Sequence, residues 1–518
     1  MWYIAQILVS PPPANSWRSV ALALLSFALC VAHFATFDVV TPPLITDIKY
    51  YVIFSWLMNE GAVPHLDFFD NKTQLASFVG AAMHWFSAMI GADPLYGLRV
   101  GYLGIAAGIG VVTATVHNRL LRGDWVAGLL ATLAYCSFGF IGISAAMGPV
   151  PKLIVFLASG VSALLVYRRS WILAGAVGAI SFMDWQVGAW VWICALATAL
   201  IFETDRRSAC LRLIAGGFLG MAPFVIYYAV QGALGEAWDQ AIVASFYRGT
   251  EKLDSTTLVE RVQHVQVLTR IYFPGREFLL AFSAVGVIVG VVRLARRWSD
   301  DTTRLLFPLY SFNVGIVAFS ALDFQWQGDY LLLLCSASFF LALAWITFYE
   351  ATDRWLTRFG PGPARAVAAG VLLLAGVAMA RPAFLRPGIP LHPGDALIGT
   401  KWSGEFTTLQ DQREVADAIL QRADGGRMIF LDRVELHYLV NRPNPMPLIY
   451  WNYPVWTHFR HSENESNEQT LSRLLENFDP DVLVYPAQMA KKIPLLEGYD
   501  LEIFNSKTER YKVRLFVR

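Results

Sequence analysis

Long apolar runs recur along the chain up to about residue 380, separated by short polar or basic segments. A membrane-crossing helix needs about 20 mainly apolar residues, and about eleven runs come near that length. The pattern therefore predicts a polytopic α-helical membrane protein. The expected spans are 18–38, 97–117, 125–143, 151–167, 171–184, 187–203, 212–231, 277–294, 305–322, 329–349 and 364–380.

The distribution of arginine predicts how these spans are oriented. With the spans above, every basic cluster falls on the same side of the membrane as Arg18, which should be the cytoplasm. If the apolar run 74–90 also crossed the membrane, the basic clusters after it would fall on the side opposite to Arg18. We therefore expect this run to form a juxtamembrane or re-entrant helix on the outer face. The clusters are Arg119/Arg122, Arg168/Arg169, Arg206/Arg207/Arg212, Arg293/Arg296/Arg297/Arg304 and Arg354/Arg358/Arg365.

Three long segments are expected on the outer side: a first outer loop (39–96), a second outer loop (232–276) and the region after Arg381. In the last region the apolar runs shorten to strand length and alternate with amphipathic helical patterns. We therefore predict two domains, a transmembrane module over 1–380 and a small periplasmic α/β domain over 381–518. The expected strands are 428–432, 481–486 and 512–518, and the expected helices are 407–422 and 468–477.

Composition supports a membrane protein and narrows its partners. The 518-residue chain is 55% hydrophobic and 16% charged, with a mean hydropathy of +0.45, whereas a soluble protein carries about 25% charged residues. A net charge of +1 argues against a nucleic-acid partner, which normally requires a basic face. The five cysteines show no spacing typical of a metal cluster or a disulfide framework.

The first outer loop holds the most informative charged residues, Asp47, Asp67, Asp70 and Lys72, among aromatic and apolar neighbours. Charges near a bilayer are costly to desolvate, which favours a role in chemistry. A carboxylate can orient or deprotonate an acceptor hydroxyl, and a cation can hold a phosphate leaving group. The alternatives are an N-cap for a helix over 48–59 at Asp47 and solvated loop residues for the others. A divalent cation on Asp47 and Asp70 is left open.

Further polar residues are expected on the same outer face. Each of these residues alone could be an interface anchor. Because all of them are expected on the same face as the first outer loop, we consider them candidate site residues. Two arginines of the second outer loop are candidates for binding a phosphate. The span-end residues are Lys152, Asp184, Gln186, Asp329 and Tyr330, and the two arginines are Arg248 and Arg270.

The order of motifs resembles a known family. A first helix is followed by the early acid Asp47, a Gly-Ala-Val-Pro turn (61–64), DFFDNK (67–72) and GADPLYGLRV (91–100), and HYLVNRPNPMPLIYW follows at 437–451. This arrangement is similar to membrane glycosyltransferases of the GT-C superfold, in the protein O-mannosyltransferase and aminoarabinose-transferase-like group. The resemblance implies transfer of a sugar from a polyprenyl-phosphate carrier to an envelope acceptor.

The resemblance also implies roles for individual residues. Asp47 matches the catalytic acid of the first loop, Asp67 and Asp70 match the second acidic position, and Lys72 is the basic residue that closes this motif. Asp184, Gln186 and Lys152 are expected to line the substrate site. The candidates for binding the donor phosphate are Lys72, Arg248, Arg270, Asp329 and Tyr330.

The chain departs from the family pattern at two places. Thr73-Gln74 stands where proline commonly follows the second acid, and Ile48 stands where the first acid is often followed by Glu. These departures bear on the identity of the base and the sugar, and leave the expected fold unchanged.

We therefore expect an inverting glycosyltransferase of the bacterial inner membrane, with its active site and α/β domain in the periplasm. Its donor would be a polyprenyl-phosphate sugar, and its acceptor a lipopolysaccharide, another glycan or a protein. One alternative is a transporter or flippase of a lipid-linked glycan, and another is a catalytically inactive scaffold. The acids lie in one asymmetric outer loop, and this favours the enzyme over a transporter built from paired halves.

Overall fold

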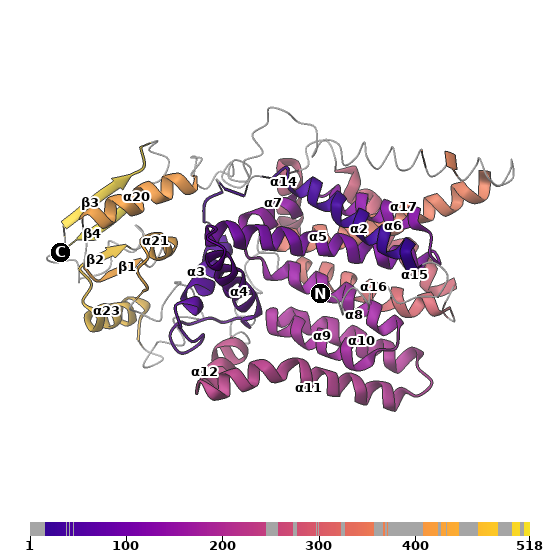
Figure 1. Ribbon diagram of the computed structural model, residues 1–518, viewed down its shortest axis with the longest axis horizontal. Coiled ribbons are helices and arrows are strands. Elements are labelled where there is room, and N and C mark those ends of the chain that lie inside the picture. The colour runs from indigo at the N-terminus through magenta and orange to yellow at the C-terminus, as the bar shows by residue number, and fades with distance from the viewer. Residues whose placement is uncertain are drawn as a thin grey trace.

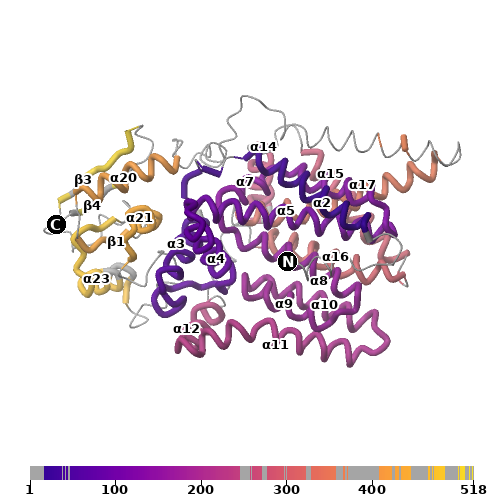
Figure 2. The backbone as a smooth tube through the Cα atoms, in the orientation of Figure 1, coloured from indigo at the N-terminus to yellow at the C-terminus, as the bar shows by residue number. Residues whose placement is uncertain are grey.

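The computed structural model contains a bundle of helices with an α/β part at one end, and α3 and α4 stand between the two (Figure 1). We define the α/β part as the described residues between 408 and 517. The smooth backbone trace in Figure 2 shows the same arrangement. The structure describes residues 16–37, 39–40, 42–44, 46–244, 257–272, 277–296, 298, 300–322, 327–356, 366–367, 370, 408–422, 426–430, 433–444, 465–484, 500–507 and 512–517.

Six of the described helices are long and apolar enough to cross a membrane, so the chain is a polytopic helical membrane protein, as the apolar runs predicted. Shorter apolar helices lie among them, and the predicted span 364–380 falls almost wholly outside the described residues. The six are α2 (Ser16–Phe34), α5 (Pro94–Leu120), α11 (Arg206–Val230), α15 (Phe278–Arg296), α16 (Asp301–Leu322) and α17 (Gln327–Leu356). The shorter ones are α4 (Leu75–Met89), α8 (Pro151–Tyr167), α9 (Trp171–Asp184) and α10 (Ala189–Phe202), which follows η1 (Gln186–Gly188).

The span predicted at 125–143 is instead two helices, α6 (Trp125–Cys136) and α7 (Gly139–Met147), which meet at a bend of 64°. At the break, the Ser137 hydroxyl donates a hydrogen bond of 2.8 Å to the carbonyl oxygen of Leu133. Such back-bonding bends helices. Phe138 then adopts a non-helical conformation, and the chain changes direction.

The first outer loop folds into α3 (Thr46–Asn59) and α4 (Leu75–Met89), close to the helices predicted at 48–59 and 74–90. Small residues of α4 allow close packing on α3, since a Cβ atom at Gly80 would lie 2.1 Å from the Ser55 hydroxyl. The opposite face of α4 exposes Trp85 and Phe86. A helix that buries small residues on one face and exposes apolar ones on the other fits the expected juxtamembrane position.

The α/β part contains helices and strands where the sequence predicted them. Its four-stranded sheet has the order β1-β2-β4-β3, with β1 parallel to β2 and the other pairs antiparallel. Strand β3 was not predicted; it lies at the edge of the sheet, where Ile503 is exposed. The elements are α20 (Leu409–Arg422), β1 (Met428–Phe430), α21 (Glu435–Leu439), α23 (Asn467–Phe478), β2 (Val482–Val484), β3 (Asp500–Asn505) and β4 (Lys512–Val517).

A buried histidine holds β1 against the turn after α21. The Nε2 atom of His437 accepts a hydrogen bond of 3.1 Å from the backbone N–H of Phe430, so the ring is neutral with its proton on Nδ1. Nδ1 in turn donates to the carbonyl oxygen of Arg442 at 3.0 Å. Burial lowers the pKa of His437 to about 3, from an ordinary 6.5.

This histidine should make the stability of the α/β part depend on pH. Because the folded-state pKa is lowered, the unfolded chain takes up a proton first, and the stabilisation is lost as the pH falls from about 6.5 towards 3. We expect a loss of about 2 kcal/mol between pH 6.5 and 5 from this group. A glutamine at position 437 can accept and donate in the same way without titrating. Thermal unfolding of His437→Gln at pH 7 and pH 5 should therefore show a smaller shift than wild type, and equal shifts would contradict this account.

The α/β part packs on the two helices of the first outer loop. Tyr438 of α21 contacts Trp56 of α3 edge to face, with ring centroids 5.9 Å apart, and also faces His84 of α4. Lys49 of α3 pairs with the buried Glu435 at 3.3 Å. Tyr438, from the start of the motif at 437–451, thus lies against the loop that holds the predicted acids.

Candidate active site

Asp47 lies in the first turn of α3, inside the helix. Its side chain is 71% exposed, and its Oδ2 atom accepts a hydrogen bond of 3.5 Å from the Nζ atom of Lys72. A negative charge in the first turn is favoured by the helix dipole. Asp47 is therefore an accessible carboxylate held beside an ammonium group.

Asp70, by contrast, is only 2% exposed. Its carboxylate accepts hydrogen bonds from the backbone N–H of Lys72, at 3.0 Å, and from the side-chain amide of Gln74. These bonds shape the turn that presents Lys72. Gln74, one of the residues at which the chain departs from the pattern it resembles, thus makes a direct contact to this acid.

Asp67 is exposed and belongs to its own turn. Its Oδ2 atom accepts a hydrogen bond of 2.6 Å from the backbone N–H of Val63. Lys72 thus contacts Asp47 through its ammonium group and Asp70 through its backbone N–H, whereas Asp67 contacts Val63 in a separate turn.

Lys72 is the centre of this arrangement. Its side chain is 25% exposed, and its ammonium group lies 5.4 Å from the ring centroid of the buried Tyr51 on α3. A cation over an aromatic face is stabilised by the ring quadrupole. With Asp47 on one side and Tyr51 on another, the ammonium is oriented rather than freely mobile.

Two glutamines tie this loop to distant segments. The side-chain nitrogen of Gln186 donates to the carbonyl oxygens of Asn71, at 2.9 Å, and Ala241, at 2.8 Å. Gln240 lies in η2 (Asp239–Val243), after α12 (Leu234–Trp238). It accepts a hydrogen bond of 3.2 Å from the backbone N–H of Asp70. The second outer loop therefore supports the first. Gln240 was missed from the sequence, because a single glutamine has no distinguishing pattern.

Gln240 also fixes which ring nitrogen of His65 carries a proton. Its side-chain oxygen lies 3.1 Å from Nδ1 of His65, and its nitrogen donates to the His65 carbonyl oxygen at 2.8 Å. Because an amide oxygen only accepts, Nδ1 of His65 carries a proton. Burial lowers the pKa of His65 to about 4, so this ring is neutral at physiological pH.

A second charged pair lies at the N-terminal ends of α8 and α17. The Nζ atom of Lys152 is 3.1 Å from Oδ1 of Asp329, and the two side chains are 17% and 5% exposed. The ammonium also lies 5.3 Å from the ring centroid of Trp185. The neighbouring Tyr330 is buried, and its hydroxyl donates to Thr269 of α14 (Leu258–Tyr272) at 3.1 Å.

Replacing only one residue of the Lys152–Asp329 ion pair should strongly destabilise the protein. Removing one partner of a buried ion pair leaves an uncompensated charge and costs about 3–5 kcal/mol, whereas replacing both with apolar residues is often neutral. We expect Lys152→Met to lower the thermal unfolding midpoint in detergent, and the double variant Lys152→Met/Asp329→Leu to recover most of the loss. Additive losses in the double variant would argue against this pair.

The remaining predicted residues are more scattered. Asp184 is fully buried at the end of α9, beside Ala76 at the start of α4. Arg270 is exposed on α14. Arg248 lies outside the described residues. Within the described part of the chain, no group of three or more His, Cys, Asp or Glu side chains could hold a metal ion, and the cation site on Asp47 and Asp70 stays a prediction.

No family model matches the chain. Over 245 residues it is 24% identical to a dolichol phosphate-mannose mannosyltransferase of Haloferax volcanii, a match that covers 46% of this chain and 52% of the relative. The chain thus spans about half the length of the curated relative that it matches.

Two solved structures resemble almost the whole chain. The crystal structure of ArnT from Cupriavidus metallidurans in the apo state matches with a TM-score of 0.56 and 14% identity, over 97% of this chain and 98% of ArnT. The structure of the same ArnT bound to undecaprenyl phosphate matches with a TM-score of 0.54 and 13% identity, over 97% and 98% of the two chains. The fold expected from the first-loop motifs is therefore confirmed: this chain is a polytopic membrane protein with the GT-C fold of ArnT.

Proposed function

We propose that the protein is a membrane glycosyltransferase that moves a sugar from a polyprenyl-phosphate carrier to an envelope acceptor. The observation that carries this proposal is the exposed carboxylate of Asp47 next to the oriented ammonium of Lys72. One group can take a proton from an acceptor hydroxyl, and the other can bind a phosphate on which negative charge develops.

The proposed reaction is a single displacement at the anomeric carbon of the donor sugar. The acceptor oxygen forms a bond to this carbon, the bond from the carbon to the phosphate oxygen breaks, and the configuration inverts. The acceptor proton passes to Asp47, and the polyprenyl phosphate leaves with its charge compensated by Lys72. Because Asp70 is buried and hydrogen-bonded to Lys72 and Gln74, its proposed role is to position Lys72.

The other predicted residues take supporting parts in this proposal. Gln186 holds the backbone at Asn71, next to Lys72. The Lys152–Asp329 pair and Tyr330 would border the binding site of the polyprenyl-phosphate donor, and Arg270 could bind its phosphate group. Asp184 would contribute to the wall of the site, and Asp67 to the shape of the loop. Arg248 is still proposed to bind the phosphate group of the donor.

Two of the similar proteins support the class of donor. The ArnT structure was solved with undecaprenyl phosphate, and the Haloferax volcanii relative is named for dolichol phosphate-mannose. Both compounds are polyprenyl phosphates or their sugar esters, which agrees with a phosphate-binding lysine at a membrane surface. The acceptor is proposed to be lipopolysaccharide, another glycan or a protein.

The distribution of charge supports a periplasmic site in the bacterial inner membrane. The arginine-rich helix ends carry ion pairs such as Arg122–Asp300 and Arg304–Glu203, and positive charge marks the cytoplasmic side. Asp47 and Lys72 belong to the first outer loop, assigned to the other side. On this basis we propose a transmembrane module over 1–380 and a periplasmic domain over 381–518.

The proposal is tested with purified protein and a panel of radiolabelled polyprenyl-phosphate hexoses and pentoses, in the presence of envelope glycans and lipids. We expect label to appear in an acceptor, with release of free polyprenyl phosphate and inversion at the anomeric carbon. Nucleotide sugars serve as control donors and should give no transfer. Movement of intact labelled lipid across proteoliposomes without release would instead support a transporter. Neither transfer nor movement, from folded protein, would favour an inactive scaffold.

A further inference from the structure

The segment that precedes Asp47 depends on other parts of the chain for its shape. Residues 42–44 are buried and outside any helix or strand, and α3 begins only at Thr46. Pro42 and Pro43 lack backbone N–H groups, so the segment cannot form a regular ladder. Its buried carbonyl groups therefore need donors from elsewhere in the protein.

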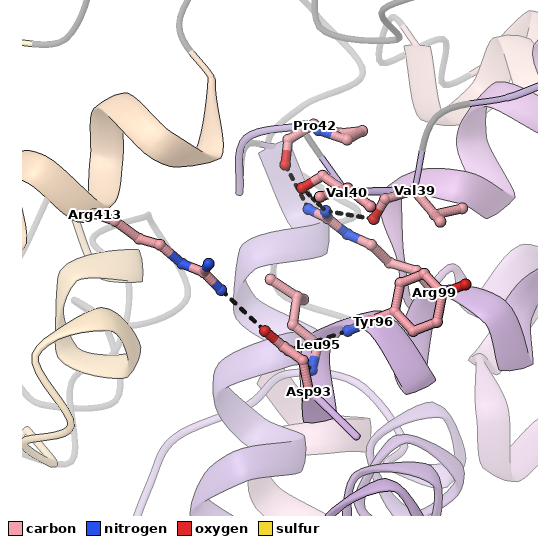
Figure 3. Close-up of polar contacts among 8 residues, drawn as sticks. All are labelled: Val39, Val40, Pro42, Asp93, Leu95, Tyr96, Arg99 and Arg413. Atoms are coloured by element: carbon pink, nitrogen blue, oxygen red, sulfur yellow. Dashed lines mark hydrogen bonds and ion pairs between the residues drawn. The ribbon is translucent and has the colours of Figure 1, made fainter. Parts of the chain in front are cut away.

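Arg99 of α5 supplies donors from the side of the helical bundle (Figure 3). Its guanidinium group is fully buried, with Nη1 at 2.9 Å from the carbonyl oxygen of Val39 and 3.3 Å from that of Val40. Nη2 donates to the carbonyl oxygen of Pro42 at 2.5 Å. The planar fork of an arginine suits such multiple contacts, and it fixes the course of the chain from Val39 to Pro42.

Gln412 of α20 completes the support from the side of the α/β part. Its side chain is 1% exposed. Its amide oxygen accepts a hydrogen bond of 2.8 Å from the Leu44 N–H, and its amide nitrogen donates to the Leu44 carbonyl oxygen at 3.1 Å. A side-chain amide thus pairs with both backbone groups of one residue, as a neighbouring strand would. Leu44 lies three positions before Asp47.

The next residue of α20 makes a different contact. Arg413 pairs with Asp93 at 3.1 Å, and both side chains are about half exposed (Figure 3). Asp93 caps α5 and is remote in sequence from Asp47. An exposed pair of this kind contributes little to stability, about 0–1 kcal/mol. Two adjacent residues of one helix therefore reach the first outer loop at different places, and only Gln412 touches the segment before Asp47.

We infer that Gln412 is a positioning residue for Asp47, and that the α/β part is a component of the catalytic site. This inference rests on the proposed function. Gln412 and Arg99 hold the entry to α3 from opposite sides of one short segment, which sets where the carboxylate of Asp47 stands relative to Lys72. Since a displacement of about 1 Å can cost 10²-fold in rate, loss of one support should be visible in turnover.

The test compares Gln412→Met, which keeps the volume of the side chain but makes neither hydrogen bond, with the matched control Arg413→Met. We expect Gln412→Met to lower kcat by about 10–100-fold, with the KM for the polyprenyl-phosphate donor unchanged. Arg413→Met should keep kcat within about twofold of wild type, as expected for an exposed pair. Wild-type turnover in Gln412→Met would overturn the inference while the proposed function stands. Equal losses of turnover and thermal stability in both variants would also overturn it, since docking alone would then explain the effect.

A glutamate at position 412 provides a readout that simple packing would not change. A protonated carboxyl group can accept from the Leu44 N–H and donate to its carbonyl oxygen, whereas a carboxylate only accepts. The activity of Gln412→Glu relative to Gln412→Met should therefore rise as the pH falls. A ratio that is independent of pH would contradict the inference.

Hydrogen exchange separates this inference from the proposed function. The Leu44 N–H is buried and bonded to Gln412, so exchange in a peptide that covers residues 39–47 should accelerate in Gln412→Met and remain slow in Arg413→Met. Faster exchange with no transfer by any form of the protein would support the Gln412 contact and remove the proposed function. Unchanged exchange would remove the contact whatever the activity.

Discussion

Asp47→Asn should lose sugar transfer by a factor of about 10²–10⁴, the range that a positioned general base contributes. Asparagine has nearly the same volume and can still contact Lys72, but it cannot take a proton from an acceptor hydroxyl. Because Asp47 is exposed in the first turn of α3, its replacement should leave the fold intact. The measurement is transfer of label from the donor found with wild type, together with the thermal unfolding midpoint.

Asp67→Asn is the matched control for this variant. Asp67 is an exposed acid of the same loop, and its carboxylate contacts the backbone N–H of Val63, a bond that an asparagine oxygen can replace. We expect its transfer rate to stay within about threefold of wild type, because surface substitutions rarely have large effects. An Asp47→Asn variant with full activity would exclude Asp47 as the base, and equal losses in both variants would point to the loop as a whole.

Lys72→Met should weaken both binding and turnover of the donor. Removing one preorganised group that stabilises developing charge typically costs about 10²–10³ in kcat. Methionine retains the contact with Tyr51 but has no charge for the phosphate and no partner for Asp47. We expect slower release of polyprenyl phosphate and a higher inhibition constant for added polyprenyl phosphate, both measured with wild type as reference.

Two further variants define what the Lys72 result means. Lys72→Arg keeps the charge but changes the shape of the donor group, and it should recover part of the lost activity. Lys507→Met removes a positive charge in the α/β part, where the contact to Glu414 is made by the Lys507 backbone. It should behave as wild type. If Lys72→Met were inhibited by polyprenyl phosphate as strongly as wild type, another cation, such as Arg270, would bind the phosphate.

Most of the fold could be predicted from patterns within single segments of the sequence. The length of the apolar runs predicted the membrane helices, and short runs with amphipathic neighbours predicted strands and helices close to α20, β1, α23, β2 and β4. These signals depend on periodicity within one segment, which is legible without knowledge of the fold. The edge strand β3 was missed although it pairs with β4, the next strand along the chain, and the bend at Ser137 and Phe138 was missed because it depends on a single side-chain bond.

The partners of the candidate site could not be predicted in the same way. Gln240, Gln412 and Arg99 are polar residues of helices, and their contacts join segments up to 368 positions apart. No spacing along the chain reports such a contact. From the sequence alone, a polar residue in a predicted helix could equally well be buried or exposed to solvent, because its burial depends on what packs against it.

The sequence by itself determined that this is a polytopic helical membrane protein, where many of its described helices run, and that the first outer loop concentrates acids around a lysine. Hydrophobic length and the placement of charge are sufficient for those conclusions. Only the tertiary structure decided which acid is accessible and which is buried. Asp47 and Asp70 are the same residue type in one loop, yet their exposure and hydrogen bonds differ because Gln74, Gln240 and the α/β part are brought to them by folding.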